Sequence, residues 1–322
     1  MRQIAKSARL HWKFYQEFLN NRYFNLGIGG ATAAYILRAV ASGMFIPFSL
    51  QEITNGLFNR SVGSMSQGLW LLALAGLIYA ITEWLFRPFW IGIAQSIRLI
   101  KMRLVKGVAG GAARDNGDDI GKLVNDVDFV MWNVGNIINS MVPNLFTAAV
   151  AEVTIFEMSP ILGLVGLIGL PFYVALLEHY VKNVEEARGL ERRAYSESIH
   201  AASEYLAGRA GADAFTSAMD RWIRGISRNI HLDREYWSSS FAVGYAVPLI
   251  TALIGVNYVN EGRLSVGSLV GALTASLTMH TALVNAFWGI CLLGQNTVAI
   301  SRIFSIREAS ARRTLAPVQA AP

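Results

Sequence analysis

The sequence has one cysteine, few histidines and few charges. Cys291 is the only cysteine, which excludes an intramolecular disulfide, and the five histidines show none of the spacings that hold a metal. Charged residues make up 16% of the 322 residues, whereas soluble domains carry roughly 25%. This composition argues against a water-soluble helical protein, and we expect no metal site.

A phosphate-binding loop is also absent. The motif G-x-x-x-x-G-K-[ST] surrounds phosphate with backbone N–H groups, and it occurs nowhere in the chain. The nearest string, from Gly117 to Leu123, has the wrong spacing, ends in leucine, and contains aspartates that would repel phosphate. We therefore expect that this chain is not an enzyme and has no catalytic residue and no cofactor of its own.

Six long apolar segments dominate what is present. They cover residues 25–50, 68–95, 129–156, 160–181, 238–259 and 266–300. Because about 20 mostly apolar residues cross a bilayer as a helix, the segments predict an all-α integral membrane protein with six transmembrane helices. We assign residues 24–306 to this domain.

Lysine and arginine are distributed unevenly over the connecting stretches. Five precede Tyr23, six lie in 97–128, nine lie in 182–235 and four follow Ile300, whereas the alternate connections hold two. Basic residues stay on the cytoplasmic side of a membrane, so both termini are predicted to be cytoplasmic. We expect a bacterial cytoplasmic membrane, and the net charge of +6 indicates topology and no nucleic-acid partner.

The two ends of the chain differ from its apolar middle. In residues 1–23, Leu10, Phe14 and Phe18 form an apolar stripe at helical spacing. This stripe favours a helix lying in the cytoplasmic membrane interface, with an ordinary soluble amphipathic helix as the alternative. Residues 307–322 predict a short, disordered cytoplasmic tail, while the charged stretch 182–235 predicts long helices that project into the cytoplasm.

Three stretches carry recognisable motifs. The first reads GDDIGKLVNDVDFV from Gly117, and the second reads EYLAG from Glu204, followed by DAF from Asp213. The third is GRLSVGSLV from Gly262, followed by AISRIF from Ala299. In their order and spacing against six crossings, these stretches resemble the transmembrane domain of ABC exporters over nearly the whole chain. The acidic cluster in the first stretch departs from the family, as does the run LVNA where the family often has a proline in its last helix.

The resemblance implies two short coupling helices, around residues 112–122 and 206–216, that dock into grooves on ATPase subunits. Those subunits would be separate chains that bind ATP and Mg. The resemblance also implies a dimer of six-helix subunits, homomeric or heteromeric, in which the fourth and fifth helices cross to the partner. The residues that it assigns to coupling are Asp115, Gly117, Asp118, Asp119, Lys122, Glu204, Leu206, Gly208, Arg209, Asp213 and Phe215.

Four ionisable residues fall inside the apolar segments: Arg38, Glu83, Arg87 and His280. Such groups are costly in a membrane and usually face water or a partner. Counted along the helices, Arg38, Glu83 and His280 lie at a similar depth, roughly 10 Å from the cytoplasmic face. We expect Glu83 to pair with Arg38 or with Arg87. The pair either holds helices together or contacts substrate or protons, and His280 either packs by hydrogen bonding or titrates.

The last apolar segment adds a polar stripe of Asn285, Trp288, Gln295 and Asn296. In the family the sixth helix lines the substrate cavity, so these residues are cavity candidates for an amphipathic peptide, lipid or drug-like substrate. The alternative is that they hold helices together. We expect Glu152 and Glu157 to be solvated near the outer end of the third helix.

Three functions fit these observations. The first is the permease subunit of an ABC exporter with a separately encoded ATPase, which the coupling motifs favour. The second is a motor-less, proton-driven peptide transporter of the same fold, which the embedded ionisable groups allow. The third is a non-transporting accessory subunit of a membrane complex.

Overall fold

The computed structural model describes residues 2–109 and 117–315, with side chains for 5–105 and 125–305. Every element in these residues is helical. The α-helices are α1 (Arg2–Phe14), α2 (Arg22–Val40), α3 (Ile46–Phe58), α4 (Val62–Ala109), α5 (Gly117–Met158), α6 (Pro160–Gly166), α7 (Leu170–Leu206), α8 (Ala212–Asn260) and α9 (Val266–Leu315). They are supplemented by the π-helical turns η1 (Tyr15–Leu19) and η2 (Ala41–Phe45) and the 3-10 turn η3 (Leu167–Gly169).

Among the described residues, six stretches are long and apolar enough to cross a membrane. They are Arg22–Phe58, Val62–Val105, Asn125–Met158, Pro160–Leu206, Ala212–Asn260 and Val266–Ser305. Each contains one of the six apolar segments, so the predicted all-α, six-helix membrane fold is confirmed. The helices exceed what a bilayer requires, because the 49 residues of α8 extend about 74 Å against a hydrocarbon core of about 30 Å.

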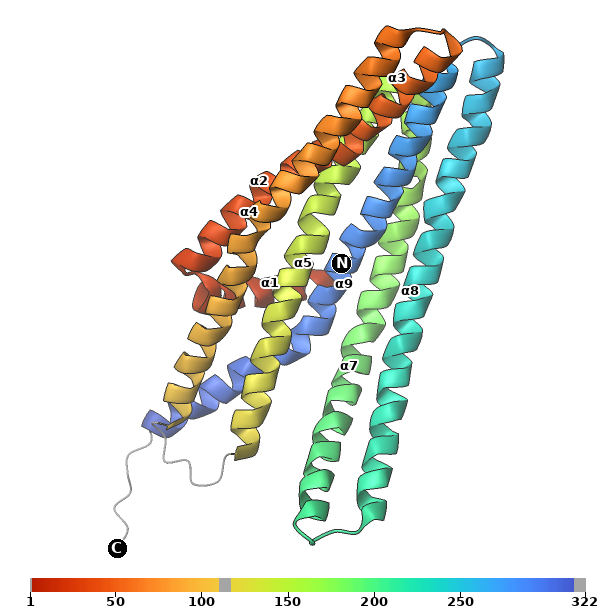
Figure 1. Ribbon diagram of the computed structural model, residues 1–322. Coiled ribbons are helices and arrows are strands. Elements are labelled where there is room, and N and C mark those ends of the chain that lie inside the picture. Colours follow the sequence, from red (N-terminus) through yellow and green to blue (C-terminus); the bar gives the residue numbers. More distant parts are fainter. Residues whose placement is uncertain (1, 110–116, 316–322) are drawn as a thin grey trace, which may run out of the picture.

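The helices form one elongated bundle (Figure 1). The turns α3–α4, α5–α6 and α8–α9 lie at one end, here called the outer end, and the α7–α8 turn lies at the opposite, inner end. In the centre, α5 packs along α9. The helices α7 and α8 run side by side as a hairpin whose tip extends beyond the inner end of α5 in Figure 1.

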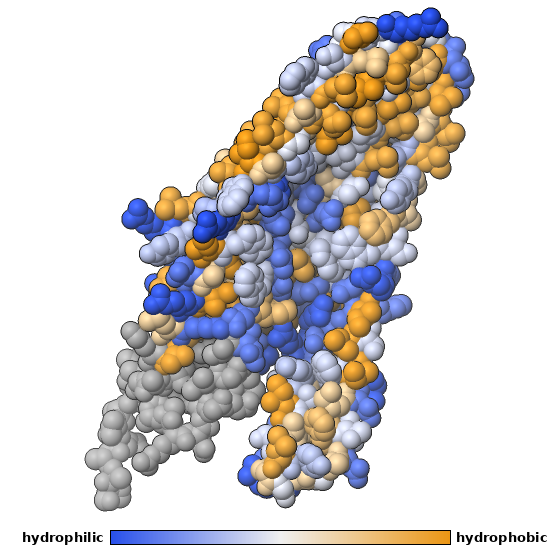
Figure 2. Space-filling model, in the orientation of Figure 1, coloured by the Kyte–Doolittle hydropathy of each residue, from blue (hydrophilic) through white to orange (hydrophobic). Residues whose placement is uncertain are grey.

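The surface changes character along the bundle. Apolar side chains cover most of the outer half of the face shown in Figure 2, and polar side chains are more frequent over the inner half. Such an apolar half suits contact with lipid chains, while polar helices extend beyond it. The charged stretch 182–235 accordingly lies within the long helices α7 and α8.

The N-terminal segment forms the separate helix α1, followed by η1. Its apolar stripe packs on α9, because the ring of Phe14 lies 6.4 Å and that of Phe18 lies 5.8 Å from the ring of Phe304. Its position in a membrane interface stays a prediction. At the other end of the chain, α9 continues to Leu315, into the segment 307–322 that was expected to be a disordered tail. Residues 316–322 lie outside the described residues.

The first span is interrupted by η2, just before Pro47. Proline lacks an N–H and its ring clashes with the carbonyl group four residues earlier, so a widened turn relieves an otherwise helical stretch. Within η2, Gly43 lies against α5, where an added Cβ would be 2.8 Å from the backbone nitrogen of Ala151. This close approach of two backbones requires glycine.

We expect Gly43→Ala to lower the free energy of unfolding by about 1–3 kcal/mol, because the added methyl group overpacks the contact with α5. Gly29→Ala is the matched control, since an added Cβ there meets nothing within 4 Å. The control is expected to be neutral or stabilising by up to about 1 kcal/mol. Thermal unfolding of the purified protein in detergent measures both, and equal effects would contradict the proposed close contact.

Candidate functional site

An ion pair links the first two spans. The Arg38 guanidinium donates to Glu83 Oε1 at 2.6 Å and to Thr82 Oγ1 at 2.7 Å. It also lies over the rings of Phe86 at 4.5 Å and Tyr79 at 5.1 Å, which adds cation–π attraction. Of the two partners expected for Glu83, the structure shows Arg38.

The two members of this pair differ in exposure. The side chain of Arg38 is 19% exposed, but that of Glu83 is 69% exposed. Arg87 is also exposed, one turn further along α4. Arg38 is therefore held by its neighbours, whereas Glu83 presents its carboxylate at the surface of this single chain.

An open cavity of 340 Å³ lies beside this ion pair. It is lined by Ser42, Tyr79, Asn144, Thr147, Leu277, Thr278, Thr281 and Ala282. The cavity is continuous with the Arg38 environment, because Ser42 donates to the Arg38 carbonyl oxygen at 2.8 Å and Tyr79 contacts the guanidinium. The hydroxyl groups of this wall have no distinguishing spacing in the sequence and were not predicted. The mixed polar and apolar wall suits an amphipathic ligand.

The polar stripe on α9 does not share one environment. Asn285 is partly exposed and donates to the Thr281 carbonyl oxygen at 2.9 Å, one turn from the cavity. By contrast, Asn296 is fully buried and donates to the carbonyl oxygen of Val130 on α5 at 3.2 Å. The structure therefore places one residue beside the cavity and the other in a helix–helix contact.

The remaining stripe residues join a polar network with α7 and α8. Gln295 donates to the Tyr180 hydroxyl at 2.6 Å, and this hydroxyl donates to Asp233 Oδ1 at 2.6 Å. Arg188 donates to Gln295 Oε1 at 3.2 Å and lies 3.5 Å from Asp233 Oδ2. The indole of Trp288 lies 5.7 Å from the Tyr180 ring. These contacts join three helices in the inner half of the bundle.

His280 occupies a different place from the Arg38–Glu83 pair. It is fully buried on α9, where its Nδ1 lies 3.2 Å from the hydroxyl of Tyr173 on α7. Depth counted along a helix does not show which side of the helix a residue faces. Arg38 and Glu83 join the first two spans, whereas His280 contacts α7.

Glu152 contradicts the expectation of a solvated group. Both of its carboxyl oxygens are buried and have no hydrogen-bond partner in the described part of the chain. Glu157, five residues further along α5, is exposed as expected. Solvation at this end of the helix was inferred from position alone, but Gly166 of α6 lies against the Glu152 carboxyl group.

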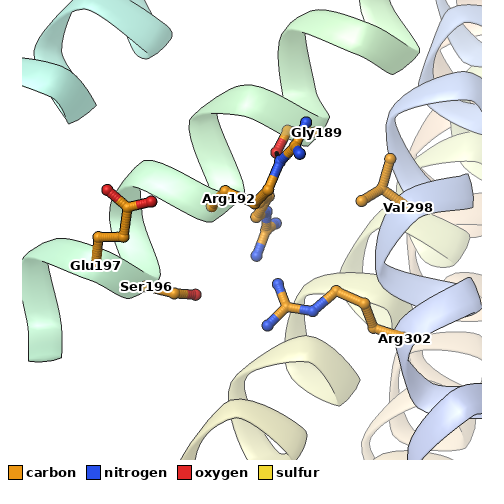
Figure 3. Close-up of a pocket in the computed structure, with 7 residues that line it drawn as sticks. Gly189, Arg192, Ser196, Glu197, Val298 and Arg302 are labelled. Carbon is orange, nitrogen blue, oxygen red and sulfur yellow. Dashed lines mark hydrogen bonds between the residues drawn. The ribbon is translucent and has the colours of Figure 1, made fainter.

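A cleft of 480 Å³ separates α7 from α9 at the inner end. It is lined by Gly189, Arg192, Arg193, Ser196, Glu197, Val298 and Arg302. Figure 3 shows the guanidinium groups of Arg192 and Arg302 approaching each other from the two helices. Like charges this close require a shared counter-ion.

That counter-ion is Asp126 of α5. Its Oδ1 lies 3.3 Å from Arg192 and its Oδ2 lies 3.4 Å from Arg302, while its side chain is only 4% exposed. The Arg192 guanidinium also stacks on the Phe129 ring at 3.9 Å. Asp126 thereby joins α5, α7 and α9. The Asn-Asp-Val run was noted in the sequence, but the partners of the aspartate were not foreseen.

The second coupling segment is a turn and contains no separate helix. In the structure α7 ends at Leu206, α8 begins at Ala212, and Gly208 adopts a positive φ of 70°. The left-handed glycine closes the end of α7, so the predicted coupling helix over 206–216 is wrong. The Arg209 guanidinium donates two hydrogen bonds to the Glu204 carboxylate across this turn, at 2.8 and 2.9 Å. This hydrogen bonding raises the pKa of Arg209.

The residues assigned to coupling are only partly described. Asp115 lies outside the described residues, and α5 begins at Gly117. The side chains of Asp118, Asp119 and Lys122 also lie outside the described set. At the second segment, Leu206 and Asp213 are exposed and Phe215 is half-buried.

The family model of the ABC transporter transmembrane region matches residues 31–283. The chain belongs to this family. No curated protein matches the sequence. The family membership makes the chain a permease-type transport domain and an integral membrane protein. It also implies association with nucleotide-binding partners and oligomerisation in general.

We expect Asp126→Asn to lower the free energy of unfolding by about 2–4 kcal/mol, because both arginines lose their buried counter-ion. Asp128→Asn is the matched control on the same helix. Asp128 pairs with Lys101 at 2.7 Å but is 41% exposed, so its loss is expected to cost less than about 1 kcal/mol. Thermal unfolding in detergent compares the two, and similar losses would rule out the proposed role of Asp126.

Proposed function

We propose that this chain is the permease subunit of an ABC exporter for an amphipathic substrate, driven by separately encoded ATPase subunits. The ATP and Mg would bind to those subunits, and this chain would be no enzyme. Two six-helix subunits, identical or different, would form the transport unit in a bacterial cytoplasmic membrane with both termini inside. The basic residues concentrated at the inner end support this orientation.

The tip of the α7–α8 hairpin is the observation that carries the proposal. Leu206 is 84% exposed and Tyr205 is 47% exposed, beside the Glu204–Arg209 pair that holds the turn. Exposed apolar side chains on a turn that is held by an ion pair suit contact with another protein. Members of this family associate with nucleotide-binding partners. A nucleotide-binding subunit bound at this tip would contact α7 and α8 together and could displace both helices.

We expect Leu206→Glu to abolish or greatly reduce the copurification of the ATPase subunit that accompanies the wild-type chain. It should also reduce vanadate-sensitive transport, because the substitution puts a charge into an apolar contact. Leu57→Glu is the control, since Leu57 is also exposed (61%) but lies at the outer end. Affinity purification from membranes and ATP hydrolysis assays measure both variants.

Two results would replace this proposal by an alternative. Transport that collapses with a protonophore but not with vanadate, with no ATPase subunit bound, would support the motor-less, proton-driven transporter. A stable, stoichiometric complex with unrelated membrane subunits and no transport would support the accessory subunit.

The cavity beside Arg38 supports the choice of an amphipathic substrate. Threonine and serine hydroxyls, an asparagine and a tyrosine share its wall with Leu277 and Ala282. The exposed Glu83 carboxylate and the nearby Asn285 extend this polar surface. A ligand with both an apolar body and a polar or cationic group would use both kinds of contact.

We expect Thr281→Val to raise the half-saturating concentration of a fluorescent amphipathic cation about fivefold, which corresponds to one lost hydrogen bond of about 1 kcal/mol. Thr274→Val is the matched control two turns away on α9. Its hydroxyl donates to the Val270 carbonyl oxygen at 2.8 Å and does not line the cavity. Transport into inverted vesicles measures both, and an equal change in the control would remove the cavity from the substrate path.

A further inference from the structure

The fourth span breaks close to the outer end. Helix α6 ends at Gly166, η3 follows, and Pro171 stands at the start of α7. In a 3-10 turn, residues three apart lie on the same face. Gly166 and Gly169 therefore present one glycine-lined face to the neighbouring helices.

Two ionisable side chains approach this face. A Cβ added to Gly166 would lie 2.8 Å from Glu152 Oε2, and one added to Gly169 would lie 2.8 Å from His280 Cε1. The carboxyl group from α5 and the imidazole from α9 thus lie against the same face, whose two glycines are one 3-10 turn, or about 6 Å, apart along the helix axis. Neither glycine tolerates a side chain without displacing one of these groups.

Several polar atoms at this place lack a hydrogen-bond partner in the described part of the protein. Both Glu152 oxygens are buried without a hydrogen-bond partner among the described residues. The His280 ring lies near the Gly166 backbone. Its Nε2 has no hydrogen-bond partner among the described residues, while its Nδ1 lies 3.2 Å from the Tyr173 hydroxyl. Ser276, one turn before His280 on α9, is fully buried, and its hydroxyl also has no partner within the described ranges.

No charged side chain in the described ranges offsets a charge on Glu152 or His280. Tyr173 from α7 is the titratable group that contacts His280, and Tyr236 from α8 lies beyond Tyr173, where its hydroxyl donates to the Val284 carbonyl oxygen. Tyr173 belongs to a buried apolar cluster that also includes Ala148 and Ala151 of α5, Leu162 of α6, and Ala272, Ala275 and Met279 of α9. A carboxylate without a donor or counter-ion is very unfavourable in such a place.

We propose that Glu152 and His280 form a proton-binding site at the break of the fourth span. The Glu152 carboxyl group holds one exchangeable proton while α5, α6 and α9 are packed together. When the proton passes to water, the carboxylate left behind requires solvation, which the packed arrangement does not offer. Protonation therefore favours the packed arrangement, and deprotonation favours opening of this region to water. The site goes beyond the proposed function and requires no ATPase subunit.

A bound proton fits better than a metal ion. The described residues contain no group of three or more histidine, cysteine or acidic side chains that could hold a metal. One carboxyl group and one imidazole with an occupied Nδ1 supply too few ligands for the usual coordination shells. They are sufficient to hold and exchange a proton.

Infrared spectroscopy of the full chain in lipid nanodiscs tests the site directly. In protein labelled with ¹³C-carboxyl glutamate, the wild type should show a carbonyl band of neutral carboxylic acid at neutral pH, where exposed glutamates are ionised. Glu152→Gln should remove this band. Glu157→Gln is the matched control, because Glu157 is exposed on the same helix, and it should leave the band unchanged.

The pH dependence gives a second readout. The melting temperature of the wild type should fall as the pH is raised from mildly acidic to alkaline. The folded state binds a proton that the unfolded state has already released, so a rise in pH favours the unfolded state. In Glu152→Gln this fall should be smaller, while Glu157→Gln should behave as the wild type. Exchange of sodium for potassium at fixed pH should change neither readout.

Three results would overturn the proposal. The first is a wild-type spectrum without a neutral-acid band at neutral pH, which requires no variant to fold. The second is a band that persists unchanged in Glu152→Gln. The third is a melting temperature that depends on sodium at fixed pH, which would assign the site to a monovalent cation. Each readout uses the chain alone, so each is independent of whether a motor subunit binds.

Discussion

The packing of α5 against α9 is the constraint on which the rest of the structure depends. Near the middle, Gly289 allows such close approach that an added Cβ would lie 2.9 Å from the Met141 Cβ. Further inward, Asn296 bonds the backbone of α5, and Asp126 pairs with Arg302. Helix α5 carries Glu152, α9 carries His280, and both helices contribute to the wall of the open cavity, so each of these sites depends on how closely the two helices pack.

The chain handles its embedded charges in three different ways. Arg38 and Glu83 pair at a surface and use aromatic rings as additional support. Asp126 is buried, but it has two arginine partners from different helices. The carboxyl oxygens of Glu152 are buried with neither a counter-ion nor a hydrogen-bond donor in the described residues. An ionisable group in a membrane protein is costly unless paired or solvated, so these arrangements suit different roles: surface contact, helix linkage and proton exchange.

Long helices connect the two proposed sites. The α7–α8 hairpin carries the exposed tip at one end, and the break of the fourth span lies near the other end of the same continuous stretch. Between them, Arg188, Arg192 and Tyr180 connect α7 to its neighbours. A displacement of the tip would act on these contacts together, because a packed helix moves as a stiff element.

From the sequence, the contacts that could be predicted were those between residues at the same depth on consecutive spans. Arg38 and Glu83 were expected to pair because they share a depth on consecutive spans, and the structure shows this pair. His280 was expected at the same depth but faces α7, and Glu152 was expected to be solvated, although its carboxyl oxygens are buried beside Gly166 of α6. The prediction of a second coupling helix was wrong, because Gly208 ends α7 and α8 begins at Ala212, which leaves only a turn between them.

The sequence by itself determined the six spans and the long charged hairpin, and its motifs indicated the family. These properties follow from apolar length and local spacing, which act within one helix. Only the tertiary structure decided which side of each helix meets another. It brought Asp126 to two arginines and placed Glu152 and His280 on one glycine face, because helix rotation and the break at η3 are set by packing between segments far apart in the chain.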